Sequence, residues 1–185
     1  MLGGMGVMRT AGTVAAAAIC LALAGPASAL ACPRDGAKPH RLTPKEARAA
    51  VVCLINQRRE SRGLPKLRLD QRLIRAAQRH SNSMDSANYF SHVSPGGGTP
   101  QSRIQRTGYI AGASAWGIAE NIRWGRAGRG SPKAAVASWM ASSAHRAAML
   151  SSSYRELGVG VTIGSPTSGG ERNSAIYTAA FGYRR

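Results

Sequence analysis

GVGVTI, residues 158–163, marks the point where the chain changes from a helical to an extended pattern. This stretch and AIYTAAF, residues 175–181, are predicted to be strands. The turn-rich residues 164–173 between them predict a hairpin. Upstream, the periodic stretches have helical spacing. Helices first and strands last indicate an α+β domain built in layers around one core.

Several helix starts can be identified upstream by their caps. TPKE, residues 43–46, supplies a Thr N-cap, a Pro at the first helical position and a Glu that completes a capping box. Asp70 can cap a second helix, and cap-plus-proline pairs recur at residues 99–100 and 131–132. His80 falls on the apolar face of the helix that follows Asp70. We therefore interpret His80 as a packed helix histidine rather than a ligand.

The first residues have the pattern of a secretory signal peptide. Arg9 precedes an apolar run at residues 11–24, and a small-residue cleavage site ends at Ala29. The apolar run is too short for a comfortable membrane span. Cleavage after Ala31 is the alternative. It would leave Cys32 as the first residue and open the route to a lipid-anchored cysteine.

After the signal peptide, the length of the chain favours a single domain. The predicted organisation is a signal peptide at residues 1–29, an extended N-terminal arm at residues 30–42 and a folded domain at residues 43–185. The arm is predicted because residues 30–42 combine prolines, a glycine and mixed charges.

The three cysteines predict one disulfide bond. Cys20 leaves with the signal peptide, so Cys32 and Cys53 remain as an even pair in an oxidising compartment. Their disulfide would tie the N-terminal arm to the first helix. The alternative is a free, buried Cys53.

The chain is strongly basic, with 25 Lys and Arg residues against 8 Asp and Glu, for a net charge of +17. Such a surface attracts polyanions, among them wall polymers, acidic lipid head groups and nucleic acids. The Arg residues are scattered and are not interleaved with aromatic residues. We therefore expect a cationic exported protein and no specific binding of nucleic acid.

Polar residues form three short groups that could meet in the fold: Ser91-His92, Glu120-Asn121 and His145-Arg146. Each lies in or beside a loop region, where binding and catalytic groups are often found. Two His and one carboxylate are a ligand set for a catalytic-type zinc ion, and they can also perform acid–base chemistry without metal. Since no His-Glu-x-x-His spacing is present, the groups must converge in space. The alternative is a structural cluster whose members satisfy one another.

The order of several short motifs is more specific than any one of them. In sequence they are NQRR (56–59), GL (63–64), FSH (90–92), GY (108–109), ENI (120–122), WMxSxxHR (139–146) and LGVG (157–160). This succession resembles the CAP superfamily of cysteine-rich secretory proteins, antigen five and pathogenesis-related plant proteins. It is most similar to the short bacterial members known as SCP-like extracellular proteins. The resemblance runs from about residue 47 to residue 183.

The resemblance implies an α-β-α sandwich with a central antiparallel sheet flanked by helices. It also implies a cleft with two His and two Glu, which binds a divalent metal in some members. His92 and His145 match the two histidines, and Glu120 matches the first glutamate. The second glutamate falls three residues after the helix tryptophan, where this chain has Ser142. The implied cofactor is therefore Zn²⁺ or another divalent cation held loosely by three ligands, or none.

The predicted function is that of an exported CAP module that binds an envelope or extracellular ligand. A lipid, a glycan or an anionic wall polymer would bind in the polar cleft, next to Ser91, Asn121, Ser142 and Arg146. We expect a monomer that is secreted or associated with the cell envelope, and peripheral contact with a membrane fits its basic surface.

The alternative is a hydrolase of peptide or cell-wall substrates. His92 or His145 would be the base, Glu120 would orient it, and water or a nearby Ser would attack. A Gly-x-Ser-x-Gly turn is missing from the sequence. The cluster also offers one carboxylate, whereas a glycosidase needs two across the bond.

Overall fold

The computed structural model describes residues 31–168 and 171–185. The predicted signal peptide lies outside the described residues and stays a prediction. Within the described ranges the α-helices are α1 (Pro44–Glu60), α2 (Gln71–Ser86), α3 (Pro100–Gln105), α4 (Pro132–Ala141) and α5 (Ser143–Leu150). Two short 3-10 helices are η1 (Pro39–Arg41) and η2 (Ala127–Gly130).

The sheet has four strands in the order β1-β3-β4-β2. The long strands β2 (Trp116–Arg126), β3 (Glu156–Ile163) and β4 (Ser174–Arg184) are antiparallel, and β3 and β4 form the predicted hairpin. The two-residue strand β1 (Arg68–Leu69) pairs with β3 in parallel. The sheet is therefore mixed, and the expected antiparallel arrangement is correct for its long strands.

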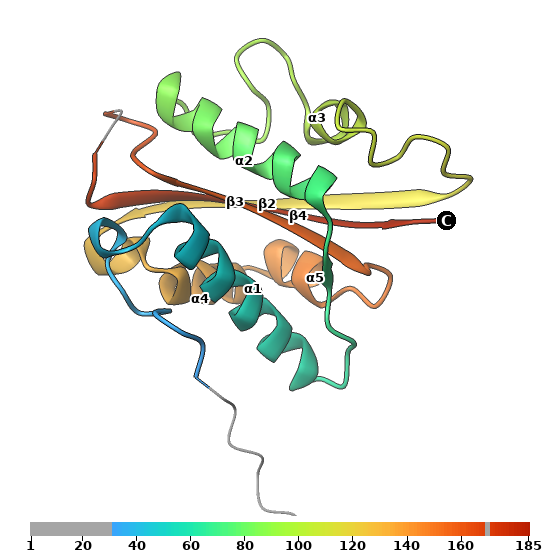
Figure 1. The fold of residues 1–185 in the computed structure, drawn as a ribbon, viewed down its shortest axis with the longest axis horizontal. Coiled ribbons are helices and arrows are strands. Elements are labelled where there is room, and N and C mark those ends of the chain that lie inside the picture. Colours follow the sequence, from blue (N-terminus) through green and yellow to red (C-terminus); the bar gives the residue numbers. More distant parts are fainter. Residues whose placement is uncertain (1–30, 169–170) are drawn as a thin grey trace, which may run out of the picture.

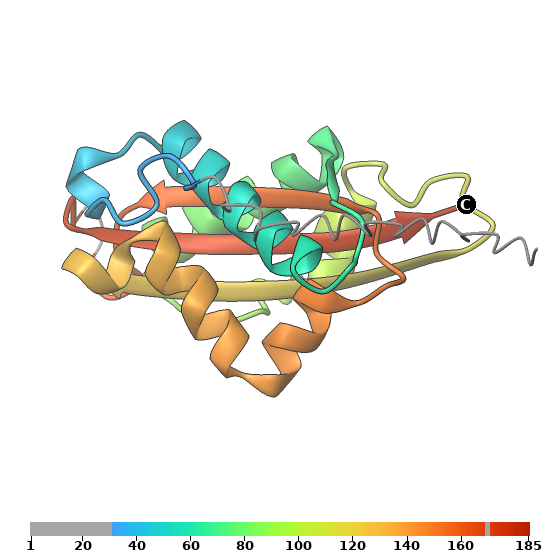
Figure 2. The same cartoon turned by 90° about the horizontal axis from the view of Figure 1, so that it is seen from below.

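The molecule is a three-layer α-β-α sandwich, as predicted. Figure 1 shows α2 and α3 on one face of the sheet, with α1, α4 and α5 on the other. Figure 2, turned by 90°, shows α1 across the strands, with α4 and α5 extending beyond the β2 edge of the sheet. Within residues 31–168 and 171–185, no helix combines the length and the apolar character that crossing a bilayer requires.

Local sequence signals start the helices where they were expected. Thr43 and Glu46 form the complete capping box of α1, and the Asp70 carboxylate accepts from the first backbone N–H groups of α2. Thr99 and Ser131 cap α3 and α4 in the same way, each before a proline. These bonds satisfy N–H groups that have no partner inside the helix.

The helix that begins at the cap-plus-proline pair of residues 131–132 ends before His145. Ser142 is extended, with φ −92° and ψ 128°, and separates α4 from α5. The Arg146 guanidinium donates to the Met140 carbonyl at 2.8 Å. Arg146 therefore binds a carbonyl left free at the C-terminal end of α4, where a cation is favoured.

The glycines of the GVGVTI stretch let α2 lie directly on β3. A Cβ at Gly158 would stand 2.1 Å from the Leu73 carbonyl carbon, and one at Gly160 would stand 2.3 Å from the backbone of Ala77. Real Cβ atoms do not approach that closely. The small residues of this motif thus set the distance between the helix and the sheet.

Beyond the end of β1, side chains from α1 and α2 bond to the exposed backbone groups of β3. The Gln78 amide donates to the Val161 carbonyl at 2.8 Å, and its oxygen accepts from the Val161 N–H at 3.1 Å. Arg48 donates to the Val159 carbonyl at 2.7 Å. These bonds replace the partners that a further strand would provide.

The N-terminal segment is tied to α1 by the predicted disulfide between Cys32 and Cys53, whose Cα atoms are 5.8 Å apart. Residues 30–42 were expected to be extended. The described part contains a turn at residues 33–36 followed by η1. Cys32 is buried in the main apolar cluster, so the segment packs on the domain as well as being crosslinked to it.

Candidate functional site

The candidate site lies at the edge of the sheet formed by β2. Side chains alternate between the two faces of a strand. Glu120 faces α2 and α3, where it meets the guanidinium of Arg103, and Asn121 faces the layer of α5. The loop between α2 and α3 places His92 next to Glu120, on the face of the sheet that α2 and α3 cover. Two neighbouring residues of β2 therefore serve two different faces.

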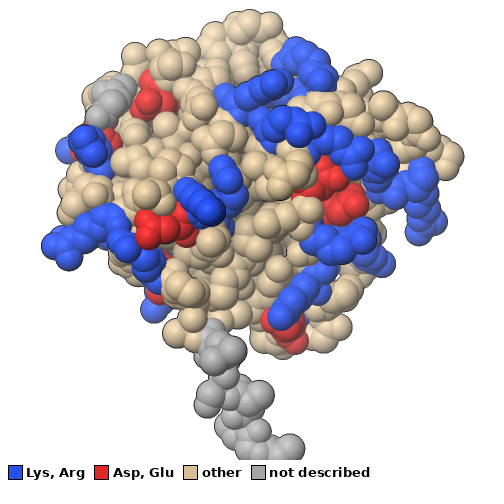
Figure 3. All heavy atoms as spheres, viewed as in Figure 1, with Lys and Arg blue, Asp and Glu red and all other residues tan. Residues whose placement is uncertain are grey.

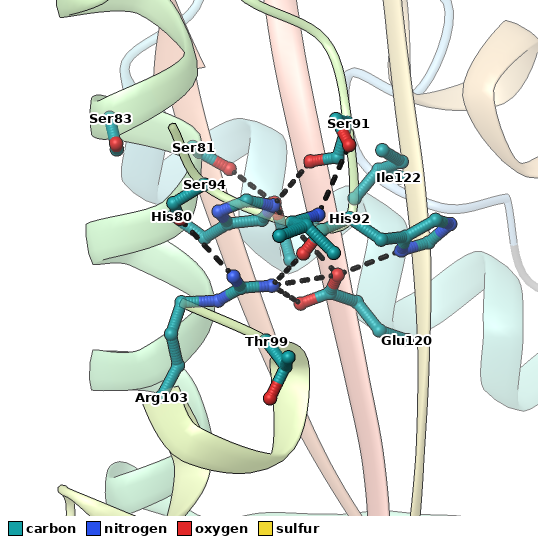
Figure 4. A network of polar contacts seen from close by, with 12 residues as sticks. His80, Ser81, Ser83, Ser91, His92, Ser94, Thr99, Arg103, Glu120 and Ile122 are labelled. Carbon is teal, nitrogen blue, oxygen red and sulfur yellow. Dashed lines mark hydrogen bonds and ion pairs between the residues drawn. The ribbon is translucent and has the colours of Figure 1, made fainter. Parts of the chain in front are cut away.

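Glu120 is the centre of the site. Its side chain is only 4% exposed. Arg103 Nη2 lies 3.0 Å from one carboxylate oxygen and 2.9 Å from the other. The His92 Nδ1–H donates to Oε1 at 2.9 Å (Figure 4). The predicted contact between His92 and Glu120 is present in the structure.

Arg103, a residue of α3, holds the site together. Its side chain is 7% exposed. Besides Glu120, it donates to the carbonyls of Gly98 at 2.7 Å and His92 at 2.9 Å. One buried cation therefore neutralises the carboxylate and fixes the glycine-rich loop. Sequence reasoning missed it, because nothing local distinguishes Arg103 from the many other arginines.

His80 is a packed helix histidine, as expected. It is fully buried, its Nε2 donates to the Ser91 carbonyl at 3.0 Å, and the Tyr89 hydroxyl lies 3.4 Å from its Nδ1. Burial lowers the pKa of His80 to about 4. It is therefore neutral at pH 7. Its Nε2 is 3.8 Å from the Glu120 carboxylate, and this contact is not an ion pair in the neutral state.

His145 approaches the pair from α5. It is partly buried, and burial lowers the pKa of His145, with a smaller lowering from the charge of His92. The Asn121 side chain donates to the His145 carbonyl at 3.0 Å, so the buried Asn121 fastens α5 to β2.

The other residues expected in the cleft have separate local roles. The Ser91 hydroxyl accepts from the Val93 N–H at 3.1 Å, which closes a turn in the loop. Ser142 lies at the junction of α4 and α5, and Arg146 binds the end of α4. The structure therefore joins His92 to Glu120, brings His145 near, and gives Ser91, Ser142 and Arg146 structural contacts.

The side chains around Glu120 differ from those of a divalent metal site. Arg103 already neutralises Glu120, and a divalent cation at that carboxylate would be repelled by the guanidinium at 2.9 Å. Among the described residues, no three His, Cys, Asp or Glu side chains lie in a group that could hold a metal. Ser142 offers a hydroxyl in place of the second carboxylate. The residues present do not fit a three-ligand metal site.

The α-β-α sandwich, with a His–Glu pair at the edge of its sheet, is a small domain of the CAP fold class. The family profile described as CAP, the cysteine-rich secretory protein family, matches residues 52–181. The chain belongs to this family.

Two curated relatives come from Bacillus subtilis strain 168. The chain is 33% identical over 110 residues to "Uncharacterized protein YkwD" and 39% identical over 111 residues to "Uncharacterized membrane protein YlbC". Each match covers 60% of this chain, but only 40% and 30% of the respective relatives. The similarity therefore concerns one part of those longer proteins.

Solved structures share the fold. An extracellular protein with an SCP domain from Bacillus anthracis is 32% identical, with a TM-score of 0.57 over 76% of this chain and 43% of that one. An outer surface protein of Borrelia burgdorferi has a TM-score of 0.64 over 78% of this chain and 97% of that one. At 20% identity, the Borrelia protein supports the fold alone.

Proposed function

We propose that this protein is an exported CAP module that binds an anionic component of the cell envelope through its basic surface. The observation that carries the proposal is the excess of unpaired positive charge. Most carboxylates of the described chain are already in ion pairs, namely Glu46, Glu60, Asp70, Glu120, Glu156 and Glu171. With 25 basic against 8 acidic residues, most Lys and Arg side chains are left without a carboxylate.

Lys and Arg side chains are spread over the face of the molecule that Figure 3 shows, and some of them lie over the part that Figure 1 assigns to α2 and α3. Arg75, Arg79 and Arg106 are exposed there. Uncompensated charge of one sign attracts polyanions and accelerates their association. The proposal therefore names an anionic partner rather than a neutral glycan.

Two further observations support an extracellular setting. The Cys32–Cys53 disulfide is typical of oxidising compartments. The similar protein from Bacillus anthracis is described as extracellular. Together with the predicted signal peptide, they favour secretion or attachment to the envelope.

Binding to lipid vesicles at increasing salt tests the proposal. Vesicles that contain phosphatidylglycerol should bind the domain, and pure phosphatidylcholine vesicles should not. Binding should weaken steeply as salt rises, because the Debye length falls from about 10 Å at 0.1 M to about 3 Å at 1 M. Equal binding to both vesicles, or binding that does not respond to salt, would contradict the proposal.

A hydrolase is the second candidate, and one observation favours it. Glu120 holds the Nδ1 side of His92, whose side chain is 45% exposed. A carboxylate that orients an imidazole is the arrangement of a general base. The ion pair that Glu120 forms with Arg103 weakens this candidate, because the carboxylate is already engaged by a guanidinium.

His92→Ala separates the two candidates better than a change of Glu120. His92 is exposed and can be removed without breaking the buried ion pair. If the domain cleaves wall peptides or glycans, His92→Ala should abolish turnover and leave the melting temperature nearly unchanged. Turnover that survives in His92→Ala would reject His92 as the base.

A further inference from the structure

A pocket lies between α2, α3 and the loop that joins them. Its volume is about 180 Å³, several times the ~30 Å³ that one water takes up in the liquid. The polar side chains that line it are Arg79, His80, Ser83, Ser94, Arg103 and Arg106. It shares Arg103 with the candidate site.

We propose that this hollow, the arginine pocket, binds a phosphate group, either free phosphate or the phosphate of an anionic lipid head group. The idea rests on the proposed function and deepens it, because it gives the anionic partner a defined point of contact. Guanidinium and hydroxyl donors around a concave site are the usual means of holding a phosphate.

The charge of the lining supports an anion. Three guanidiniums line the pocket, and no carboxylate does. Arg103 is paired with Glu120. Neither Arg79 nor Arg106 forms an ion pair within the described residues. Like charges held together around a small volume repel, and a bound anion would relieve this repulsion.

The donors are close to one another. A Cβ placed on Gly98 would lie 3.5 Å from Arg106 Nη2 and 3.6 Å from Ser94 Oγ. The Tyr89 hydroxyl lies 2.9 Å from Ser83 Oγ and 3.2 Å from Ser94 Oγ. Arg106 and the two serine hydroxyls are therefore gathered at the same loop, where both hydroxyls can turn a proton toward a phosphate oxygen.

Arg103 adds a hydrogen-bond donor that has no acceptor in the structure. Its side chain is more than nine-tenths buried, and its Nε–H has no hydrogen-bond partner. A buried hydrogen-bond donor without a partner lowers the stability of the folded state. A small adjustment of the side chain toward a bound phosphate would satisfy this donor and leave Nη2 on Glu120.

A larger groove of about 620 Å³ lies near the start of α1, lined by residues such as Thr43, Gln78 and Thr162. Arg172 is the arginine in its lining, and the Gln78 amide is already bonded to Val161 and Asn82. This groove has neither the charge nor the free donors of the arginine pocket.

Calorimetry with inorganic phosphate at low salt, on the full mature domain, tests the pocket itself. The double variant Arg79→Gln/Arg106→Gln should weaken phosphate binding about tenfold, because charged hydrogen bonds are lost. The matched control, Arg58→Gln/Arg129→Gln, removes the same charge from exposed sites elsewhere and should change binding less than about twofold. Equal loss in both double variants, or no phosphate binding by the wild type, would overturn the proposal.

Vesicles that contain phosphatidylglycerol distinguish the source of the phosphate. A larger loss of vesicle binding in Arg79→Gln/Arg106→Gln than in the control supports a lipid head group. Loss of inorganic phosphate binding alone, with vesicle binding equal in both variants, supports a site for free phosphate. If wild-type protein ignores anionic vesicles but binds phosphate through these arginines, the proposed function fails and the pocket stands.

Discussion

The two faces of the sheet are built in different ways. On the side of α1, α4 and α5, the strands contribute large apolar residues such as Leu157, Tyr177 and Phe181 to one continuous cluster. On the side of α2 and α3, they contribute Gly158, Gly160 and Thr178, and the buried groups include His80 and the Arg103–Glu120 pair.

The comparison shows that the largest apolar cluster lies on one face of the sheet and the Glu120 carboxylate lies on the other. Burial of apolar side chains is the main favourable term in folding, so the first face holds the domain together. Buried charges are retained only when each one is paired. The second face combines two smaller apolar clusters with these paired charges, and it positions the loop that carries His92.

The largest effect should come from the apolar face. Trp139 is 1% exposed and its Nε1–H donates to the Ile122 carbonyl. Trp139→Ala should lower the free energy of unfolding by about 4 to 5 kcal/mol, since it leaves a large cavity and an unpaired carbonyl. Chemical denaturation would measure this. A loss under about 2 kcal/mol would show that the apolar face does not dominate.

A smaller but still large effect is expected from the polar face. Glu120→Gln leaves Arg103 buried without a counter-charge and should cost about 3 kcal/mol. The double variant Arg103→Met/Glu120→Leu removes both charges and should recover much of that loss. If the double variant is no more stable than Glu120→Gln, the loss comes from packing rather than from the unpaired charge.

The smallest effect concerns pH. The pKa of His80 is about 4 when folded, below its usual 6.5, because the folded protein buries the imidazole. The unfolded chain therefore binds the proton first, and stability falls as pH drops from about 6.5 to about 4, by on the order of 2 kcal/mol. His80→Gln keeps a donor for Ser91 without titrating.

The melting temperature measured between pH 7 and pH 4.5 checks this. The decline should be smaller in His80→Gln than in the wild type. An identical decline in His80→Gln would assign the acid sensitivity to other groups.

The sequence predicted those features that are encoded locally or by order along the chain. The capping box at Thr43, the Cys32–Cys53 pair and the hairpin of β3 and β4 were all found. The meeting of His92 with Glu120 was predicted because the order of the motifs matched a known family, and not from spacing alone.

The features that were missed depend on tertiary contacts. Arg103 matters because it is buried beside Glu120, and no neighbouring residue signals that burial. The break at Ser142 falls at a Ser-Ser pair inside a helical stretch, and Arg146 can bond the end of α4 only after the chain turns there. The strand β1 has two residues, too short to show a period.

The side chains of Gln78 and Arg48, which bond to the backbone of β3, affect how copies of this protein can associate. An open strand edge can recruit a strand from another chain, and this is a common start of domain swapping and of fibres. In this protein the amide of Gln78 occupies both hydrogen-bonding groups of Val161. A foreign strand would first have to displace the Gln78 side chain from Val161, so a residue of α2, the helix that also lines the arginine pocket, protects this edge against polymerisation.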